Sequence, residues 1–261
     1  MKHFITLVIV LLTSIAQADV RSDLQQQMRI LQNILPKTQK YGTPEFDERR
    51  RRLIPAAVLQ RQKGICRVIL TNQSGSGSYI GNGYVLTASH VVRTNRSVAI
   101  KSGTCFFPDV NKRVSWTRDV RHEDATIDIA VLKLDSVPEG IVALPVASKD
   151  LKWKDPVYIT GFSAGYLGYR PGYKKRQEYI QGNQYQAGEF RQAQPGDSGG
   201  PILSQKGVIV GVTSASDYAT NLYGRHTVGA KAKHISRNLA RWFKGFKFHD
   251  PTTAAECGPG G

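Results

Sequence analysis

Cysteine is scarce in this sequence, which contains three among 261 residues. Three cysteines allow at most one intramolecular disulfide, so a fold held together by several bridges is excluded. Cys66 and Cys105 lie in the same half of the folded region, whereas Cys257 lies in a tail rich in glycine and proline. We therefore expect Cys66 and Cys105 to form the bridge. A chain of this length also buries a core that does not depend on cross-links.

Long hydrophobic runs are also missing. No stretch reaches the roughly 20 apolar residues that cross a bilayer, so we expect no transmembrane anchor. The longest run comes after Lys2 and ends in the small-x-small pattern Ala16-Gln17-Ala18, which predicts a secretory signal peptide. A membrane anchor is the alternative, but polar residues follow the run at once. Residues 1–18 are thus expected to be a bacterial-type signal peptide, and the mature protein to be secreted or periplasmic.

Acidic residues are few. The sequence has 36 lysines and arginines against 20 aspartates and glutamates, a formal net charge of +16. Such a surplus favours an anionic surface, polymer or protein as partner through salt-sensitive attraction. The sequence lacks a recognition helix, zinc-finger spacing and an aromatic RNA-binding motif, so we expect no specific nucleic-acid recognition. Solubility or localisation is the simpler interpretation of the charge.

Residues 19–52 differ in composition from the residues on their C-terminal side. The amphipathic stretch DLQQQMRILQNIL gives way to Pro36, Gly42 and Pro44, and then to the charged run EFDERRRR. This composition predicts a pro-segment or linker. The four arginines offer a processing site before Leu53, so we expect the protein to be made as a precursor. A solvated charge run is the alternative interpretation.

The rest of the chain lacks long helical patterns. Short stretches rich in β-branched and aromatic residues, such as CRVILT, SVAIKSG, DIAVLKL, PVYITG and GVIVGVTS, alternate with glycine, asparagine and serine. This texture predicts an all-β fold of closed barrels and argues against βαβ units. One helix is expected near the end, where the apolar residues at helical intervals are Ile235, Leu239 and Trp242 or Phe243. The tail, 250–261, is expected to be disordered.

The stretch QPGDSGGPI places three glycines and two prolines around Ser198, more backbone constraint than a surface turn requires. A nucleophilic serine needs a base, an orienting carboxylate and donors for the oxyanion. His90 follows the apolar strand of YVLTASHVV, and Asp128 begins the apolar strand of TIDIAVLKL, where a partly buried carboxylate needs a hydrogen-bond partner. Asp119 and Asp124 do not precede an apolar strand. A Gly/Ser/Asp cluster is most often a turn, which is the structural alternative.

Taken together, TASHVV, DIAVLKL and GDSGGP, in the order His, Asp, Ser, resemble the catalytic blocks of the chymotrypsin-like (trypsin-fold) serine peptidases. The resemblance covers about residues 53 to 245. It implies a domain over residues 53–249 with two six-stranded Greek-key β-barrels, the active site between them, and a C-terminal helix. Short gaps between the blocks and the lack of a cysteine beside His90 bring the sequence closer to the bacterial glutamyl-endopeptidase type.

The resemblance also implies a role for each residue of these blocks. Ser198 would attack the scissile carbonyl to form an acyl-enzyme, His90 would act as general base and then acid, and Asp128 would orient the imidazole. The amides of Gly196 and Ser198 would form the oxyanion hole, in which each donor is worth about 10²–10³ in turnover. Asp197 would be buried beside this loop, where in many relatives it binds the N-terminal amine that processing creates.

By the same resemblance, a specificity pocket is expected on both sides of the nucleophile. Its residues would be Gln192, Thr213, Ser214, Ala215 and Ser216. The neutral Gln192 at the pocket floor disfavours a trypsin-like preference for Arg or Lys. Thr213 occupies the place of the histidine that a glutamate-specific enzyme would have, although His226 could approach. The backbone of Ser214 would bind the substrate chain in antiparallel fashion.

The expected function is that of a secreted serine endopeptidase acting on protein or peptide substrates, with no metal or organic cofactor. Besides His90, the histidines outside the predicted signal peptide lack metal-ligand spacing; they are His122, His226, His234 and His249. One alternative is a catalytically inactive trypsin-fold binding protein whose basic surface captures an anionic partner. Another is an esterase with the same triad, but the G-x-S-x-G elbow and the α/β alternation of that class are absent.

Overall fold

The structure is a computed structural model that describes residues 54–94, 98–165, 167–178, 183–187, 193–217 and 226–253. The chain divides into two units, Met1–Arg49 and Arg50–Gly261, and all described residues belong to the second. The predicted signal peptide and pro-segment lie outside the described residues. Among those described, no helix is both long and apolar enough for a membrane crossing.

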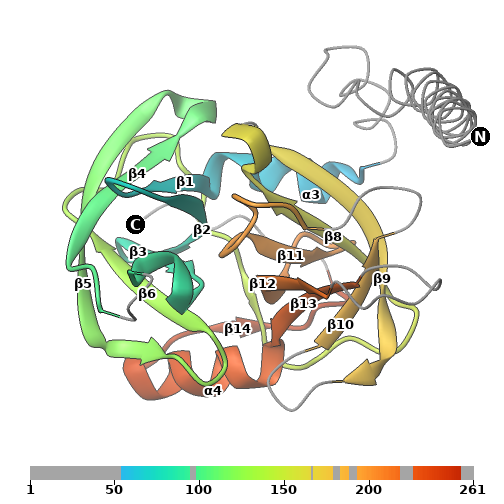
Figure 1. The fold of residues 1–261 in the computed structure, drawn as a ribbon. Coiled ribbons are helices and arrows are strands. Elements are labelled where there is room, and N and C mark those ends of the chain that lie inside the picture. Colours follow the sequence, from blue (N-terminus) through green and yellow to red (C-terminus); the bar gives the residue numbers. More distant parts are fainter. Residues whose placement is uncertain are drawn as a thin grey trace, which may run out of the picture. The chain divides into compact units, whose positions relative to one another are not determined.

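Six antiparallel strands form a closed barrel in the first half of the domain (Figure 1). They are β1 (Ile65–Ile69), β2 (Ser74–Gly81), β3 (Tyr84–Thr87), β4 (Ser102–Phe107), β5 (Lys112–Asp124) and β6 (Ile129–Leu134). Their order around the barrel is β1-β2-β3-β6-β5-β4, and the pairing of β1 with β4 closes it. Along β5, buried Val114, Trp116 and Arg118 alternate with exposed neighbours, the period of two that a strand with one face in the core requires.

The second half of the domain is an eight-stranded sheet of order β11-β8-β9-β10-β13-β12-β7-β14. The strands are β7 (Val146–Ala147), β8 (Pro156–Gly161), β9 (Gly168–Glu178), β10 (Asn183–Ala187), β11 (Pro201–Ser204), β12 (Ile209–Asp217), β13 (His226–Lys231) and β14 (Phe248–His249). An additional pairing of β11 with β12 joins six of these strands into a ring, and β7 and β14 extend the sheet with parallel pairings. The all-β prediction is therefore confirmed.

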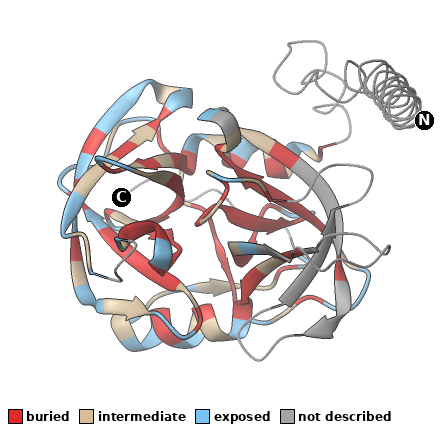
Figure 2. Ribbon diagram, viewed as in Figure 1, coloured by how far each residue is buried: buried red, intermediate tan, exposed pale blue. Residues whose placement is uncertain are grey.

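Short helical segments connect the strands. They are α3 (Ala56–Leu59), η1 (Gln60–Gly64), η2 (Ser89–Val92), η3 (Pro108–Val110), η4 (Ser163–Gly165) and the C-terminal helix α4 (Ala232–Trp242). The predicted apolar stripe of α4 faces the core, since Ile235 and Leu239 are buried, whereas Lys233 and Arg237 are exposed. The buried residues of Figure 2 lie along the strands of both sheets and on the inner side of α4.

The predicted disulfide is not formed in this structure, in which Cys66 and Cys105 are buried free thiols. Cys66 lies on β1 and Cys105 on the neighbouring strand β4, where the register places Cys105 opposite Val68. The two thiols are therefore diagonal neighbours on adjacent strands. Burial first, and then the neighbouring Cys105 thiol, raise the pKa of the Cys66 thiol well above its ordinary value.

The first residues of the segment that was expected to be disordered, 250–253, are described in the structure. Asp250, the first residue of the expected disordered segment, lies with its carboxylate 2.6 Å from Lys149 Nζ, and it accepts hydrogen bonds from Thr252. Pro251 is buried. These contacts order residues 250–253 as a turn, and the remainder of the predicted tail lies outside the described residues.

Candidate active site

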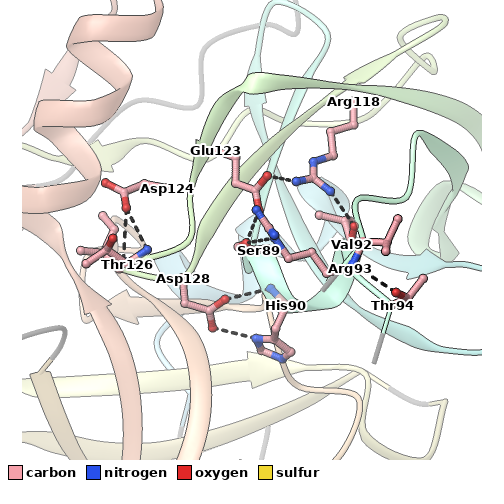
Figure 3. Close-up of polar contacts among 12 residues, drawn as sticks. Ser89, His90, Val92, Arg93, Thr94, Arg118, Glu123, Asp124, Thr126 and Asp128 are labelled. Carbon is pink, nitrogen blue, oxygen red and sulfur yellow. Dashed lines mark hydrogen bonds and ion pairs between the residues drawn. The ribbon is translucent and has the colours of Figure 1, made fainter. Parts of the chain in front are cut away.

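His90 and Asp128 meet at one end of the first barrel (Figure 3). His90 lies in η2, directly after β3, and its Nδ1 is 2.7 Å from Asp128 Oδ2. Its backbone N–H donates to Asp128 Oδ1 at 2.9 Å, so the carboxylate holds both the ring and the turn. Because Nδ1–H faces the carboxylate, Nε2 is left as the basic nitrogen of a neutral ring. The His90 side chain is 47% exposed and that of Asp128 20%.

Asp128 also takes a hydrogen bond from the second sheet. Ser214 Oγ, on β12, donates to Asp128 Oδ2 at 2.5 Å. The backbone of Asp128 has φ 59°, in the left-handed region that aspartate tolerates better than most residues. The sequence indicated that this carboxylate needs a partner but did not identify Ser214, because 86 residues separate the two and nothing local marks the contact.

The loop that carries Ser198 is fixed from within by Asp197. The Asp197 side chain is fully buried, and its carboxylate accepts the N–H groups of Ser163 at 3.1 Å and Gln194 at 2.7 Å. Backbone N–H donors thus satisfy this carboxylate in the structure. The N-terminal amine that the resemblance suggested for Asp197 would begin at Leu53, outside the described residues.

Glycine allows the same loop to approach the strand that precedes His90. Gly199 has φ +81°, and a Cβ at this position would lie 2.2 Å from Thr87 Oγ1 and 2.9 Å from Ala88 N. Only a residue without a side chain fits there. The loop of Ser198 and the turn of His90 therefore pack against each other. Among the described residues, however, no hydrogen bond joins the Ser198 hydroxyl to His90.

The backbone amides of this loop divide into bonded and unbonded groups. Asp197 N–H donates to Gln194 O at 2.9 Å, Gly199 N–H to Thr213 O at 2.7 Å, and Gly200 N–H to Asp197 O at 2.9 Å. The amides of Gly196 and Ser198 have no acceptor among the residues that the structure describes. The amides on each side of the bonded Asp197 N–H are thus available as donors, and an oxyanion site requires such donors.

Ser76 ties this loop to the first barrel. Its Oγ donates to Gly196 O at 2.7 Å and accepts from Phe162 N–H at 2.9 Å, and its own N–H donates to Ser198 O at 2.7 Å. Ser76 lies on β2 and is fully buried. Nothing in the sequence marks this role, because a serine in a Gly/Ser-rich strand resembles turn composition.

The predicted pocket residues are only partly described. Gln192 lies outside the described residues, as do the side chains of Ser216 and His226. Thr213 is buried on β12, and its Oγ1 has no hydrogen-bond partner among the described atoms. Of its neighbours, Ser214 is half-buried beside Asp128, and Ala215 is exposed. The preference of the pocket therefore stays a prediction.

The fold and the site together define a two-part β protein with a histidine–aspartate pair beside a glycine-rich serine loop. The family model of the trypsin-like peptidase domain matches residues 75–212, and the chain belongs to this family. The match spans about half of the 261 residues and includes all three blocks noted in the sequence.

Solved structures of serine proteases have a similar fold. The inactive form of the Rv3671c protease has a TM-score of 0.57 and 19% identity, over 71% of this chain and 92% of that one. A mutant of Rv3671c from M. tuberculosis H37Rv, also inactive, gives 0.57 and 18%, over 71% and 89%. The serine endoprotease from Yersinia pestis gives 0.56 and 19%, over 71% and 64%. At these identities the likeness is one of fold.

Proposed function

We propose that this protein is a secreted serine endopeptidase that hydrolyses peptide bonds through an acyl-enzyme. The observation that carries the proposal is the contact of His90 with Asp128 next to a glycine-rich serine loop, in a chain of the trypsin-like peptidase family. In this arrangement a neutral imidazole presents Nε2 as a base, and the carboxylate stabilises the imidazolium that forms.

The proposed reaction uses these groups in order. Ser198 Oγ attacks the scissile carbonyl while His90 Nε2 takes its proton, and the amides of Gly196 and Ser198 bind the developing oxyanion. His90 then donates that proton to the leaving amine, and the acyl-enzyme remains. Water, activated by the same imidazole, attacks the ester and releases the acid. Asp128 keeps its charge throughout, and its hydrogen bond from Ser214 holds the carboxylate in place.

The finer parts of the proposal concern maturation and specificity. Residues 1–18 direct export and are removed, and residues 19–52 form a pro-segment cleaved before Leu53. Gln192, Thr213, Ser214, Ala215 and Ser216 bind the substrate side chain and backbone. A neutral floor at Gln192 disfavours Arg and Lys. Kinship with glutamyl endopeptidases is a prediction that a peptide-library cleavage profile tests directly.

A binding protein on the same scaffold is the second candidate. It is favoured by the exposed cations of α4, Lys233, Arg237 and Arg241, which form no ion pair with any described residue. Uncompensated cations on one helix attract anionic partners. Retention of a histidine–aspartate contact beside the serine loop supports the enzyme instead, because a binding surface has no use for it.

The test is covalent labelling with a fluorophosphonate probe on protein processed before Leu53. Wild type is expected to be labelled at Ser198, and Ser198→Ala to lose labelling without loss of thermal stability. Ser136→Ala, at an exposed serine after β6, is the matched control and should label like wild type. Labelling that persists in Ser198→Ala contradicts the assignment. A folded, processed wild type that never labels favours the binding protein.

A further inference from the structure

The turn that carries His90 is held from outside by side chains of other elements. Gln73 Nε2 donates to the carbonyls of Val91 at 2.7 Å and Arg93 at 2.8 Å. Arg118 Nη1, from β5, donates to the carbonyl between them, that of Val92, at 2.6 Å. Three consecutive carbonyls are thus bound by side chains. Such local tethers leave the turn little freedom to move by itself.

One buried carboxylate, that of Glu123, contacts Arg118 and the residues that flank His90. Glu123 Oε1 accepts hydrogen bonds from Ser89 Oγ and from Arg93 Nε, the latter at 2.6 Å, and Glu123 Oε2 forms an ion pair with Arg118 (Figure 3). Arg93 Nε also donates to Ser89 Oγ at 3.2 Å. Ser89 precedes His90 in the chain and Arg93 follows it, so both ends of the turn are hydrogen-bonded to the Glu123 carboxylate.

The same carboxylate is part of the strand pair that presents Asp128. Glu123 lies near the end of β5 and pairs with Ala130 of β6, the strand that begins directly after Asp128. A single side chain therefore connects the element that holds the base to the elements that hold its acid. The separation of His90 from Asp128 depends on this connection as well as on their own hydrogen bonds.

The buried charges of Glu123 and Arg118 require each other as partners. The side chains of Glu123 and Arg118 are 4% and 1% exposed, so neither charge is hydrated as it would be in water. A buried charge is tolerated only when it is paired and hydrogen-bonded. Burial first, and then the charge of Arg93, lower the pKa of Arg118. Neutralising Glu123 would remove the negative charge that the guanidinium groups of Arg93 and Arg118 contact.

We propose that Glu123 is a positioning residue for His90: its carboxylate, through Ser89, Arg93 and Arg118, fixes the histidine turn relative to Asp128. The inference rests on the proposed function, in which His90 is the base for Ser198. Glu123 itself touches neither substrate nor the reacting atoms. Its effect is on the fraction of time that the imidazole spends in the orientation for proton transfer.

Three substitutions test this in the full-length, processed protein. Glu123→Gln removes the charge, Ser89→Ala removes one hydrogen bond at the start of the turn, and Arg93→Gln removes the tether at its end. Asp119→Asn is the matched control for Glu123→Gln, since Asp119 lies on the same strand and pairs with exposed Arg121 at 2.7 Å. Ser89→Ala and Arg93→Gln leave the buried pair of Glu123 with Arg118 in place, so they test the proposal even where Glu123→Gln does not fold.

Two readouts separate positioning from stability. The first is the downfield proton resonance of the His90 Nδ1–Asp128 hydrogen bond, which requires folded protein but no activity. The second is kinetic: kcat and the fluorophosphonate labelling rate, compared with KM. We expect the resonance to broaden or vanish, kcat to fall about 10- to 100-fold and KM to stay unchanged, because small misplacements of a base cost about this much.

The outcomes distinguish this inference from the proposed function. Folded Ser89→Ala and Arg93→Gln proteins with an unchanged resonance and unchanged kcat overturn the role of Glu123. A wild type that shows the resonance but never labels at Ser198 overturns the proposed function, and the resonance in the variants still tests the positioning. Loss of activity that merely follows lower thermal stability, with the resonance intact in the folded fraction, also counts against the inference.

Discussion

At the scale of the residue, Asp128 shows how much one carboxylate can organise. It accepts from the backbone and ring of His90 in one sheet and from Ser214 in the other. The contact of its carboxylate with Nδ1 selects the tautomer of His90 in which the half-exposed ring keeps Nε2 without a proton. The chemistry of the site thus depends on hydrogen bonds that span 38 and 86 residues.

The buried thiols give a prediction at this scale. Burial raises the pKa of Cys66, so the thiol stays protonated at neutral pH and is a poor nucleophile. We expect an alkylating reagent to spare Cys66 and Cys105 in the native protein and to modify both after denaturation without reductant. Mass spectrometry of the peptides is the measurement. Two cysteines that resist alkylation in the denatured, unreduced chain would instead establish the bridge that the sequence favoured.

The sequence was informative about single residues where a local pattern marks them. His90 and Asp128 each adjoin an apolar strand, and Ser198 lies among glycines, so all three are visible in short stretches. Ser76, Ser214 and the contacts around Glu123 were not, because their partners are remote in sequence and their own neighbourhoods are ordinary.

At the scale of the element, α4 combines a buried apolar stripe with a basic outer face. Burial, and then the charges of Lys233, Lys231 and Arg237, lower the pKa of His234 on this helix. A histidine whose folded pKa lies below its unfolded value binds fewer protons in the native state. Its contribution to stability is present above the unfolded pKa and is lost as the pH falls through that value toward the folded pKa.

The substitution His234→Gln tests this. Wild type should lose unfolding free energy as the pH falls below the ordinary histidine pKa of 6.5, and His234→Gln should lose less over the same range. Denaturant unfolding at a series of pH values measures the difference. Part of the loss should remain, since burial also lowers the pKa of His249. Parallel curves for variant and wild type would show that His234 does not contribute.

Strands were easier to predict from the sequence where their hydrophobic pattern is regular. DIAVLKL and PVYITG match β6 and β8 because their residues are almost all apolar. SVAIKSG was expected as a strand, but β4 begins only at Ser102. The longest strand of the first barrel, β5, was missed, because Arg118 occupies an inward position where alternation calls for an apolar residue. Its partners, Glu123 and the carbonyl of Val92, explain that arginine, and neither contact can be predicted from a single sequence.

At the scale of the whole molecule, the two sheets are joined through Ser76. It bonds Gly196 and Ser198 in the serine loop and Phe162 after β8, all from the second sheet, while belonging itself to β2. The hydroxyl is fully buried, so each bond replaces one that water would otherwise make. The relative placement of the two halves of the site depends on these contacts.

Replacement of this serine is a test of the junction. Ser76→Ala leaves Gly196 O and Phe162 N–H without their partner, and we expect it to lower the unfolding free energy by about 1–3 kcal/mol. Fluorophosphonate labelling should slow as well, because the serine loop loses its tether. Ser115→Ala, at an exposed position of β5, is the control for both measurements. Normal stability and labelling in Ser76→Ala would show that the sheets are placed by other contacts.

The division of the site between the two sheets bears on how the chain is made. When synthesis has passed β6, at Leu134, the growing polypeptide contains His90 and Asp128 but neither Ser198 nor Ser214. The last of these is added only within β12. A nascent chain that ends before β12 therefore lacks the hydroxyl that contacts Asp128, and the contacts between the two halves of the site can form only after synthesis has passed this strand.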